Sequence, residues 1–141
     1  MLVSTKGRYA LRVMIDLAEH AGEGYLPLRD IAARQDISEK YLESILKVLV
    51  KARLIEGLRG KGGGYRLTRA PQDYTVGEVV RLTEGSLDPV TGLDEPEAFR
   101  VEESRCHEMW VGLARTIGEY LDGYSIADLC ATSLAGNDYV I

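Results

Sequence analysis

Residues 28–45 constrain the fold of this chain more than any other stretch. Apolar side chains recur there at helical intervals, first over Leu28–Ala33 and again after Ser38. Between these segments, Arg34–Ile37 predicts a tight turn. Two short helices joined in this way form a helix-turn-helix, in which the second helix enters the major groove of DNA. The apolar residues that we expect to fix the pair against a core are Ile31, Ile37, Leu42, Ile45 and Leu46.

The second helix of the pair carries mostly polar side chains on its first turns. Ser38 is a good N-cap for this helix, and the helical pattern continues to about Lys51. The first turns of such a helix are the part that reaches base edges and phosphates. The residues expected to contact DNA here are Ser38, Lys40, Tyr41, Glu43, Ser44 and Lys47.

A β-hairpin is predicted directly after the helix-turn-helix. Its strands cover residues 54–59 and 65–68, and a glycine-rich tip, Gly60–Gly64, separates them. A hairpin in this position forms the wing of a winged helix, and Arg59 and Lys61 suit contact with phosphates and a narrow minor groove. A nucleotide-binding loop is disfavoured, because the glycine run lacks the Gly-Lys-Ser/Thr ending of a P-loop.

The N-terminal helix carries a further group of basic residues. Ser4 or Thr5 is the expected N-cap of this helix. Gly7 lies inside the first turn, where glycine costs about 1 kcal/mol relative to alanine. Close approach of a DNA phosphate to the helix N-terminus, beside Lys6 and Arg8, is one reason to accept that cost. The alternative is an ordinary N-terminal helix with solvated basic side chains.

Charge is divided unevenly along the chain. The net charge is −5, yet residues 1–70 hold 13 Lys and Arg against 8 Asp and Glu, whereas residues 71–141 hold 4 against 14. The basic first half therefore suits contact with nucleic acid. No stretch approaches the roughly 20 apolar residues of a membrane span, and charged residues interrupt the N-terminus where a signal peptide is apolar. We expect a cytoplasmic protein with no membrane partner.

The second half predicts a short helix, an acidic loop and a long amphipathic helix. Thr75 caps the short helix, and residues 84–98 then show no regular pattern. One long helix is expected from about Phe99 to Leu121, with apolar residues at the coiled-coil intervals 4, 3, 4 and 3. We expect this seam to pair with a second copy of the chain; the alternative is packing back onto its own domain. The seam consists of Cys106, Trp110, Leu113, Ile117 and Tyr120.

These elements predict a mainly α fold with a small β-hairpin wing. Residues 1–83 form the expected winged helix-turn-helix DNA-binding domain, and residues 84–98 form the acidic loop. Residues 99–130 hold the dimerisation helix and a short terminal helix, and residues 131–141 form a C-terminal tail.

Several separated motifs resemble one family. The segments STKGRYAL, ISEKYLESIL, RGKGGGYRL and TVGEVVRLTEG occur in order, and the chain resembles the Rrf-two family of winged-helix repressors over residues 2 to about 130. The resemblance implies a homodimer that binds a two-fold symmetric operator in double-stranded DNA. By position it places Lys40, Tyr41, Glu43 and Ser44 on the base-reading face and Arg59 on the wing. It also places Ser4, Lys6 and Arg8 in the phosphate-facing N-terminal segment.

Cofactor-binding members of the family hold an iron–sulfur cluster with three cysteines in the loop before the long helix. In this chain that loop contains no cysteine, and a cluster needs about four ligands, mostly thiolates. Cys106, the adjacent His107 and the distant Cys130 do not supply them, so we expect no cofactor and no metal. The alternative that stays open is an iron–sulfur or thiol redox-sensing regulator that uses these three residues. Neighbours on a helix point about 100° apart, so Cys106 and His107 do not predict an enzyme.

The cysteine-poor loop instead resembles the branch of the family that represses cysteine and sulfur metabolism genes. Such repressors act with cysteine synthase, an enzyme that accepts peptides ending in isoleucine. Tyr139 and Ile141 would then form a docking peptide, because a free carboxylate beside an aliphatic side chain offers compact end-recognition. The alternative is that Ile141 has no partner outside the dimer. Outside the family, the competing hypothesis is a protein–protein module without DNA binding.

Overall fold

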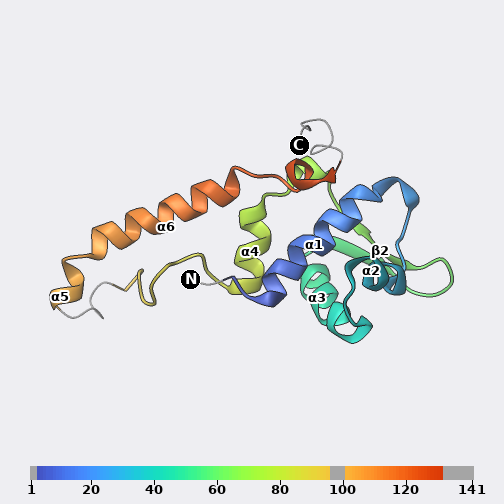
Figure 1. The fold of residues 1–141 in the computed structure, drawn as a ribbon, viewed down its shortest axis with the longest axis horizontal. Coiled ribbons are helices and arrows are strands. Elements are labelled where there is room, and N and C mark those ends of the chain that lie inside the picture. Colours follow the sequence, from blue (N-terminus) through green and yellow to red (C-terminus); the bar gives the residue numbers. More distant parts are fainter. Residues whose placement is uncertain (1–2, 96–100, 132–141) are drawn as a thin grey trace.

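The computed structural model describes residues 3–95 and 101–131, which form a head and a protruding arm (Figure 1). The head, residues 3–84, contains α1 (Thr5–Glu19), α2 (Leu28–Gln35), α3 (Glu39–Lys51), β1 (Ile55–Leu58), β2 (Gly64–Leu67) and α4 (Val76–Glu84). The arm consists of α5 (Val101–Ser104) and α6 (His107–Asp122). Short 3-10 turns lie at Ala21–Glu23, Pro71–Asp73 and Ala127–Leu129. The predicted mainly helical fold with a hairpin wing is confirmed.

Helix α1 is the centre of the head. Ser4 caps it, and the Ser4 hydroxyl accepts a hydrogen bond of 3.1 Å from the Gly7 backbone N–H. One face of α1 is fully buried and meets the inward faces of α2 and α3. The buried core that they share includes Ala10, Val13, Met14, Leu17, Ile31, Leu42, Ile45, Leu46 and Leu49. Four of the five residues predicted to fix the helix pair are in this buried set, and Ile37 packs against it.

A buried carboxylate joins α1 to the helix-turn-helix. The side chain of Asp16 is only 2% exposed, and it accepts hydrogen bonds from Arg34 Nη2 at 2.7 Å and from Gln35 Nε2 at 2.9 Å. The hydrogen bond to Asp16 raises the pKa of Arg34. Because both donors belong to its last turn, α2 continues to Gln35, two residues beyond the predicted end at Ala33. Asp36 then adopts the left-handed conformation (φ 54°) that makes the turn.

The wing is a two-stranded antiparallel hairpin with an additional backbone bridge. Ile55 pairs with Leu67 and Leu58 pairs with Gly64. Leu26, just before α2, exchanges two backbone hydrogen bonds of 2.9 Å with Tyr65 of β2. Gly64 (φ 154°) permits this bridge, since a Cβ at that position would overlap the Leu26 carbonyl oxygen. The base of the wing is therefore tied to the start of the helix-turn-helix by main-chain contacts.

Helix α4 lies between the head core and the arm (Figure 1). Thr75 caps it as predicted, and the Thr75 hydroxyl accepts a hydrogen bond of 3.0 Å from the Glu78 backbone N–H. The Glu78 carboxylate does not complete a capping box, because it pairs with Arg69 at 2.8 Å. Val76 and Val80 of α4 pack with residues of α6 in a second apolar cluster.

The arm is not the single helix predicted from about Phe99 to Leu121. It divides into α5 and α6 at Arg105-Cys106, where the Cys106 backbone N–H bonds the Glu103 carbonyl three residues back. The Ser104 hydroxyl donates to the Val101 carbonyl at 2.7 Å and competes with the helical ladder there. Residues 96–100 lie outside the described part of the chain. No helix in residues 3–95 or 101–131 is long and apolar enough to cross a membrane.

Candidate nucleic-acid interface

Part of the exposed surface of α3 faces the wing. Glu39, Glu43 and Lys47 are exposed on the side that faces the wing. Lys40 is also exposed, whereas Tyr41 is half-buried against the head core. The predicted DNA-contacting residues of α3 therefore lie at the surface of one helix, although not all of them are equally free to contact a ligand.

Two serine hydroxyls of the predicted set are engaged within α3. The Ser38 hydroxyl accepts a hydrogen bond of 3.1 Å from the Tyr41 backbone N–H, as an N-cap does. The Ser44 hydroxyl donates to the Tyr41 carbonyl at 2.6 Å. The Tyr41 ring meets the Tyr9 ring of α1 edge-on, with centroids 5.8 Å apart. These contacts orient the first turns of α3 relative to α1.

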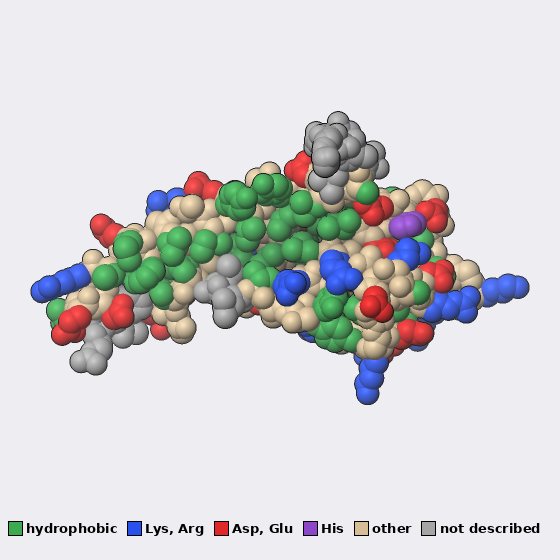
Figure 2. All heavy atoms as spheres, in the orientation of Figure 1, with side chains coloured by type: hydrophobic (Ala, Val, Ile, Leu, Met, Phe, Trp, Pro, Cys, Tyr) green, Lys and Arg blue, Asp and Glu red, His purple; other side chains and the backbone are tan. Residues whose placement is uncertain are grey.

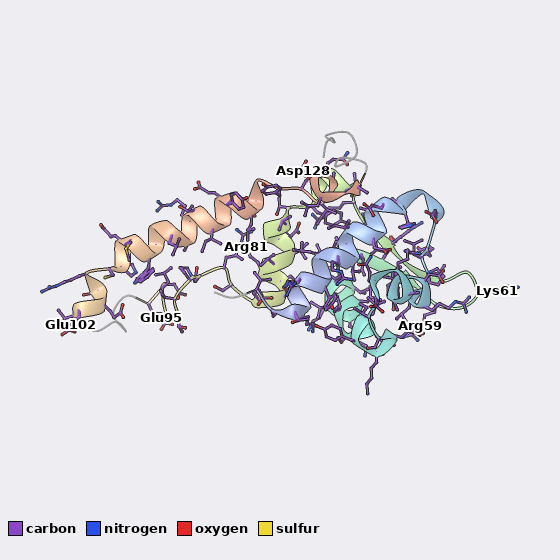
Figure 3. All side chains as sticks on the ribbon, viewed as in Figure 1. Arg59, Lys61, Arg81, Glu95, Glu102 and Asp128 are labelled. Atoms are coloured by element: carbon purple, nitrogen blue, oxygen red, sulfur yellow. The ribbon has the colours of Figure 1, made fainter. Side chains whose placement is uncertain are left out.

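The wing holds the two predicted cations at its tip. Arg59 and Lys61 are exposed, and both extend from the end of the hairpin (Figure 3). Gly60 and Gly62 adopt positive φ angles of 92° and 77°, so the tip requires residues that tolerate a left-handed backbone. The turn thus presents cationic side chains away from the head, the geometry needed to reach a neighbouring groove or phosphate.

A groove of about 1190 Å³ separates α3 from the wing. Its charged lining residues are five cations, Arg29, Lys47, Lys51, Arg59 and Lys61, and two acids, Glu39 and Glu43. Within the described ranges, no salt bridge neutralises Lys47, Lys51, Arg59 or Lys61. An open groove with surplus, unpaired positive charge suits a polyanion.

Sequence reasoning missed two of these cations. Arg29 and Lys51 line the groove but were not predicted as site residues. Arg29 lies in the first turn of α2, and its side chain is 81% exposed. Arg29 could have been recognised from the sequence, because it follows Pro27-Leu28 directly at the start of a helix. Lys51 ends α3, and only the path of the wing brings that end of the helix to the groove.

The N-terminus of α1 packs against the end of α4. Ser4 donates from its hydroxyl to the Glu84 carboxylate at 2.7 Å and from its backbone N–H at 3.2 Å. The hydroxyl bond lowers the pKa of Glu84. A Cβ at Gly7 would overlap that carboxylate, so close packing of α1 on α4 accounts for this glycine. Lys6 is half-buried and Arg8 is exposed beside them.

The predicted dimerisation seam is divided between two surroundings. Ile117 packs into the apolar cluster with α4, so this part of α6 covers its own domain. Leu113 and Tyr120 remain 40% and 63% exposed, and Met109, which was not predicted, is 57% exposed. Figure 2 shows hydrophobic side chains gathered along the arm on the face drawn. Trp110 places its indole nitrogen in a buried position with no acceptor among the residues described.

The cysteine and histidine residues do not suit an iron–sulfur cluster within one chain. The chain has two cysteines, Cys106 before α6 and Cys130 beyond its other end, and α6 is about 24 Å long. His107 uses Nε2 to contact the Leu93 carbonyl at 3.0 Å. Burial raises the pKa of the Cys130 thiol, which favours its unreactive protonated form. Across residues 3–95 and 101–131, no group of three potential metal ligands comes together.

Comparison with known proteins agrees with this geometry. The profile of the Rrf2 family, described as an iron-dependent transcriptional regulator, matches residues 3–132. The chain is 38% identical to the HTH-type transcriptional regulator CymR of Bacillus subtilis over 93% of this chain and 91% of that protein. It is 42% identical to the regulator IscR of Aliivibrio salmonicida over 92% of this chain and 77% of that protein.

Solved structures give the same result at the level of the fold. The structure of CymR, described as the global cysteine regulator of B. subtilis, matches with a TM-score of 0.79 at 36% identity, covering 94% of this chain and 98% of that one. The IscR structure from T. potens matches with a TM-score of 0.75 at 39% identity, covering 100% and 94%. The winged helix-turn-helix, the cationic groove and the matches along nearly the whole chain lead to one conclusion: this chain belongs to the Rrf2 family of DNA-binding transcriptional regulators, which are not enzymes.

Proposed function

We propose that the chain is a homodimeric repressor that reads a two-fold symmetric operator in double-stranded DNA. The observation that carries the proposal is the cationic groove between α3 and the wing. Helix α3 has the length and the exposed first turns to enter a major groove, while the wing reaches the flanking backbone or minor groove. Lys40, Tyr41 and Glu43 then lie nearest the bases, and Lys6, Arg8, Arg59 and Lys61 contact phosphates.

The proposed dimer uses the exposed side of α6. Leu113 and Tyr120 are large apolar residues at the surface. Pairing two arms through this side would place the two heads symmetrically, as a two-fold operator requires. Ile117 contributes instead by holding α6 to its own head.

The regulated genes that we propose are those of cysteine and sulfur metabolism. The proposal rests on the likeness to CymR and on the absence of a cluster ligand set in the two-cysteine chain. The alternative function is an iron–sulfur or thiol redox-sensing regulator, which the comparable identity to IscR supports. Visible absorbance of protein purified without oxygen tests the iron–sulfur form of this alternative, because an iron–sulfur protein is coloured and a thiol sensor is not.

DNA binding itself is tested by selection from random duplexes, followed by a salt titration of the enriched sequence. Log K should fall linearly with log salt, by about 0.9 for each phosphate contacted. Lys61→Ala should weaken binding to the selected and to a scrambled duplex equally, and should lower the slope by about 0.9. No enriched sequence and a response independent of salt would contradict the proposal and favour a protein–protein module.

The proposal also includes cysteine synthase as a partner through Tyr139 and Ile141, which lie outside the described residues. Its support is the family resemblance and the chemistry of a terminal carboxylate beside an aliphatic side chain. Deleting Ile141 should abolish binding to the purified synthase in calorimetry and leave DNA binding intact. Unchanged affinity for the enzyme would remove this partner from the proposal.

A further inference from the structure

Arg12 of α1 is bound to the turn of the helix-turn-helix. Its Nε donates to the Gln35 side-chain oxygen at 3.1 Å, and its Nη2 donates to the Gln35 backbone carbonyl. Gln35 is the last residue of α2, and a cation at a helix C-terminus is favourable because the unpaired carbonyls there are partly negative. Arg12 therefore holds the turn from the surface, while Asp16 holds it from the buried side.

The same guanidinium stacks on an aromatic ring that touches α3. The central carbon of the Arg12 guanidinium lies 4.5 Å from the centroid of the Tyr9 ring. Tyr9 in turn meets Tyr41 edge-on at 87°, with centroids 5.8 Å apart. A continuous series of contacts thus runs over the surface of the head from Gln35 through Arg12 and Tyr9 to Tyr41.

This series ends at the side of α3 proposed to read bases. Tyr41 belongs to the first turn of α3, and its backbone N–H donates to the capping Ser38 hydroxyl at 3.1 Å, so a contact with its ring bears on the placement of that turn. Arg12 is exposed, but two of its nitrogens and one face of its guanidinium are already used within the protein. These hydrogen bonds and the ring stack distinguish Arg12 from Lys47, Arg59 and Lys61, which line the groove and whose side chains make no hydrogen bond or salt bridge with the described residues.

We propose that Tyr9 and Arg12 are positioning residues for sequence reading, which fix Tyr41 and the first turn of α3 without contacting DNA. The inference rests on the proposed function, since it concerns the same reading face. Phosphate contacts tolerate small displacements, whereas base contacts have to be held to within about 0.5 Å by a supporting layer of side chains. Loss of this support should therefore reduce specificity before it reduces affinity for DNA in general.

The test compares the affinities of each variant for the selected duplex and for a scrambled duplex of equal length, measured by fluorescence anisotropy. Arg12→Gln and Arg12→Lys should each lower the ratio of the two affinities about tenfold and leave binding to the scrambled duplex unchanged. Lysine keeps the charge but loses the planar fork and the stack, so it should not rescue specificity. Tyr9→Leu should behave like the Arg12 variants, and Tyr9→Phe should keep the wild-type ratio because it retains the ring.

Arg69→Lys is the matched control for loss of a stacked arginine. Arg69 lies 4.6 Å from the Tyr74 ring centroid and pairs with Glu78, so its environment is chemically similar, but its hydrogen bonds go to Asp73, Tyr74 and Glu78 and not to the first turn of α3. Arg69→Lys should lower the midpoint of thermal unfolding, Tm, about as much as Arg12→Lys does, while the ratio of the two affinities stays at the wild-type value. A ratio that follows Tm in all variants, Arg69→Lys included, would overturn the positioning role.

Three further results would contradict the positioning role of Tyr9 and Arg12. If Arg12→Gln weakens binding to both duplexes equally and lowers the salt slope by about 0.9, Arg12 is a phosphate contact and the inference is wrong. If all variants keep the wild-type ratio, the inference fails and the proposed function stands. A wild-type protein that does not distinguish the duplexes would overturn the proposed function, and this inference with it.

Discussion

The hydroxyl of Tyr74 joins the wing to the rest of the head through three backbone groups. The side chain is fully buried, and its hydroxyl donates to the Leu54 carbonyl at 2.6 Å. It also accepts from the backbone N–H groups of Thr68 at 3.0 Å and Arg69 at 2.9 Å. These groups lie just before β1 and just after β2, so one oxygen atom closes the open end of the hairpin.

Removing that oxygen should therefore destabilise the head. We expect Tyr74→Phe to lower the free energy of unfolding by about 1–3 kcal/mol, because it leaves buried polar groups without a partner. Urea denaturation measures the change. Tyr25→Phe is the control: the Tyr25 hydroxyl has no hydrogen-bond partner among the described residues, and the ring that stacks with Arg66 is kept, so the change should stay within about 0.5 kcal/mol. Equal effects of the two substitutions would contradict this account.

At the scale of residues, local chemistry was predictable from the sequence and tertiary packing was not. Ser38 and Thr75 were predicted as N-caps and are confirmed, and the choice between Ser4 and Thr5 for the first helix falls on Ser4, because a cap depends on neighbours three residues away. Phosphate approach was one of two explanations offered for Gly7, and neither included Glu84 of α4, whose carboxylate a Cβ at this position would overlap. No local pattern signals that contact.

At the scale of elements, a salt bridge with a titratable carboxylate joins α4 to α6. Arg81 of α4 binds both oxygens of Asp122 at the end of α6, each at 2.8 Å. This pairing lowers the pKa of Asp122. Gly77 and Gly118 leave room for the pair, since a Cβ at Gly77 would overlap the Asp122 carboxylate and one at Gly118 would lie 3.2 Å from Arg81.

The sign of the pH dependence follows from the direction of that pKa shift. A carboxyl whose pKa is lower in the folded state stabilises the fold above its ordinary pKa of about 3.9, and this contribution is lost as the pH falls through the folded value. Both side chains are more than a third exposed, so we expect about 1 kcal/mol or less. The Tm difference between wild type and Asp122→Asn should therefore be constant near neutrality and shrink below about pH 4. A difference independent of pH down to pH 2 would show that the pair contributes nothing.

The sequence patterns predicted which elements form better than they predicted the residues at which those elements begin and end. The two helices of the helix-turn-helix and the wing were predicted because apolar periodicity and glycine position mark them. The extension of α2 to Gln35 was not, since it depends on Asp16 of another helix. The break before α6 was missed as well, because the apolar spacing continues through Cys106 although the backbone does not.

At the scale of the whole molecule, positive charge gathers at the head and negative charge at the arm. Arg59 and Lys61 lie on the wing, while Glu102 lies at the far end of the arm and Glu95 lies in the loop beside it (Figure 3). The uneven charge along the sequence predicted this division. It did not predict the groove, because Arg29 and Lys51 join it only when α2, α3 and the wing come together.

The proposed dimer gives the molecule-scale prediction. We expect Leu113→Glu to yield monomers and to weaken operator binding, because it places a charge on the exposed apolar side of α6. Light scattering after size-exclusion chromatography measures the mass. Arg115→Glu changes charge on the same helix, two residues on and away from this side, and should leave the mass unchanged. A Leu113→Glu protein with the mass of the wild-type assembly would place the dimer contact elsewhere.

The backbone bridge between Leu26 and Tyr65 has a consequence for how such a protein can evolve. Because main-chain atoms make the bridge, substitutions on the outward face of α3 do not alter the distance between that helix and the wing. Side chains such as Lys40 and Glu43 are exposed and outside the core, so their replacement costs little stability. In the proposed DNA complex, new operator sequences are therefore accessible by drift at a few surface positions, whereas the distance between α3 and the wing is inherited with the fold.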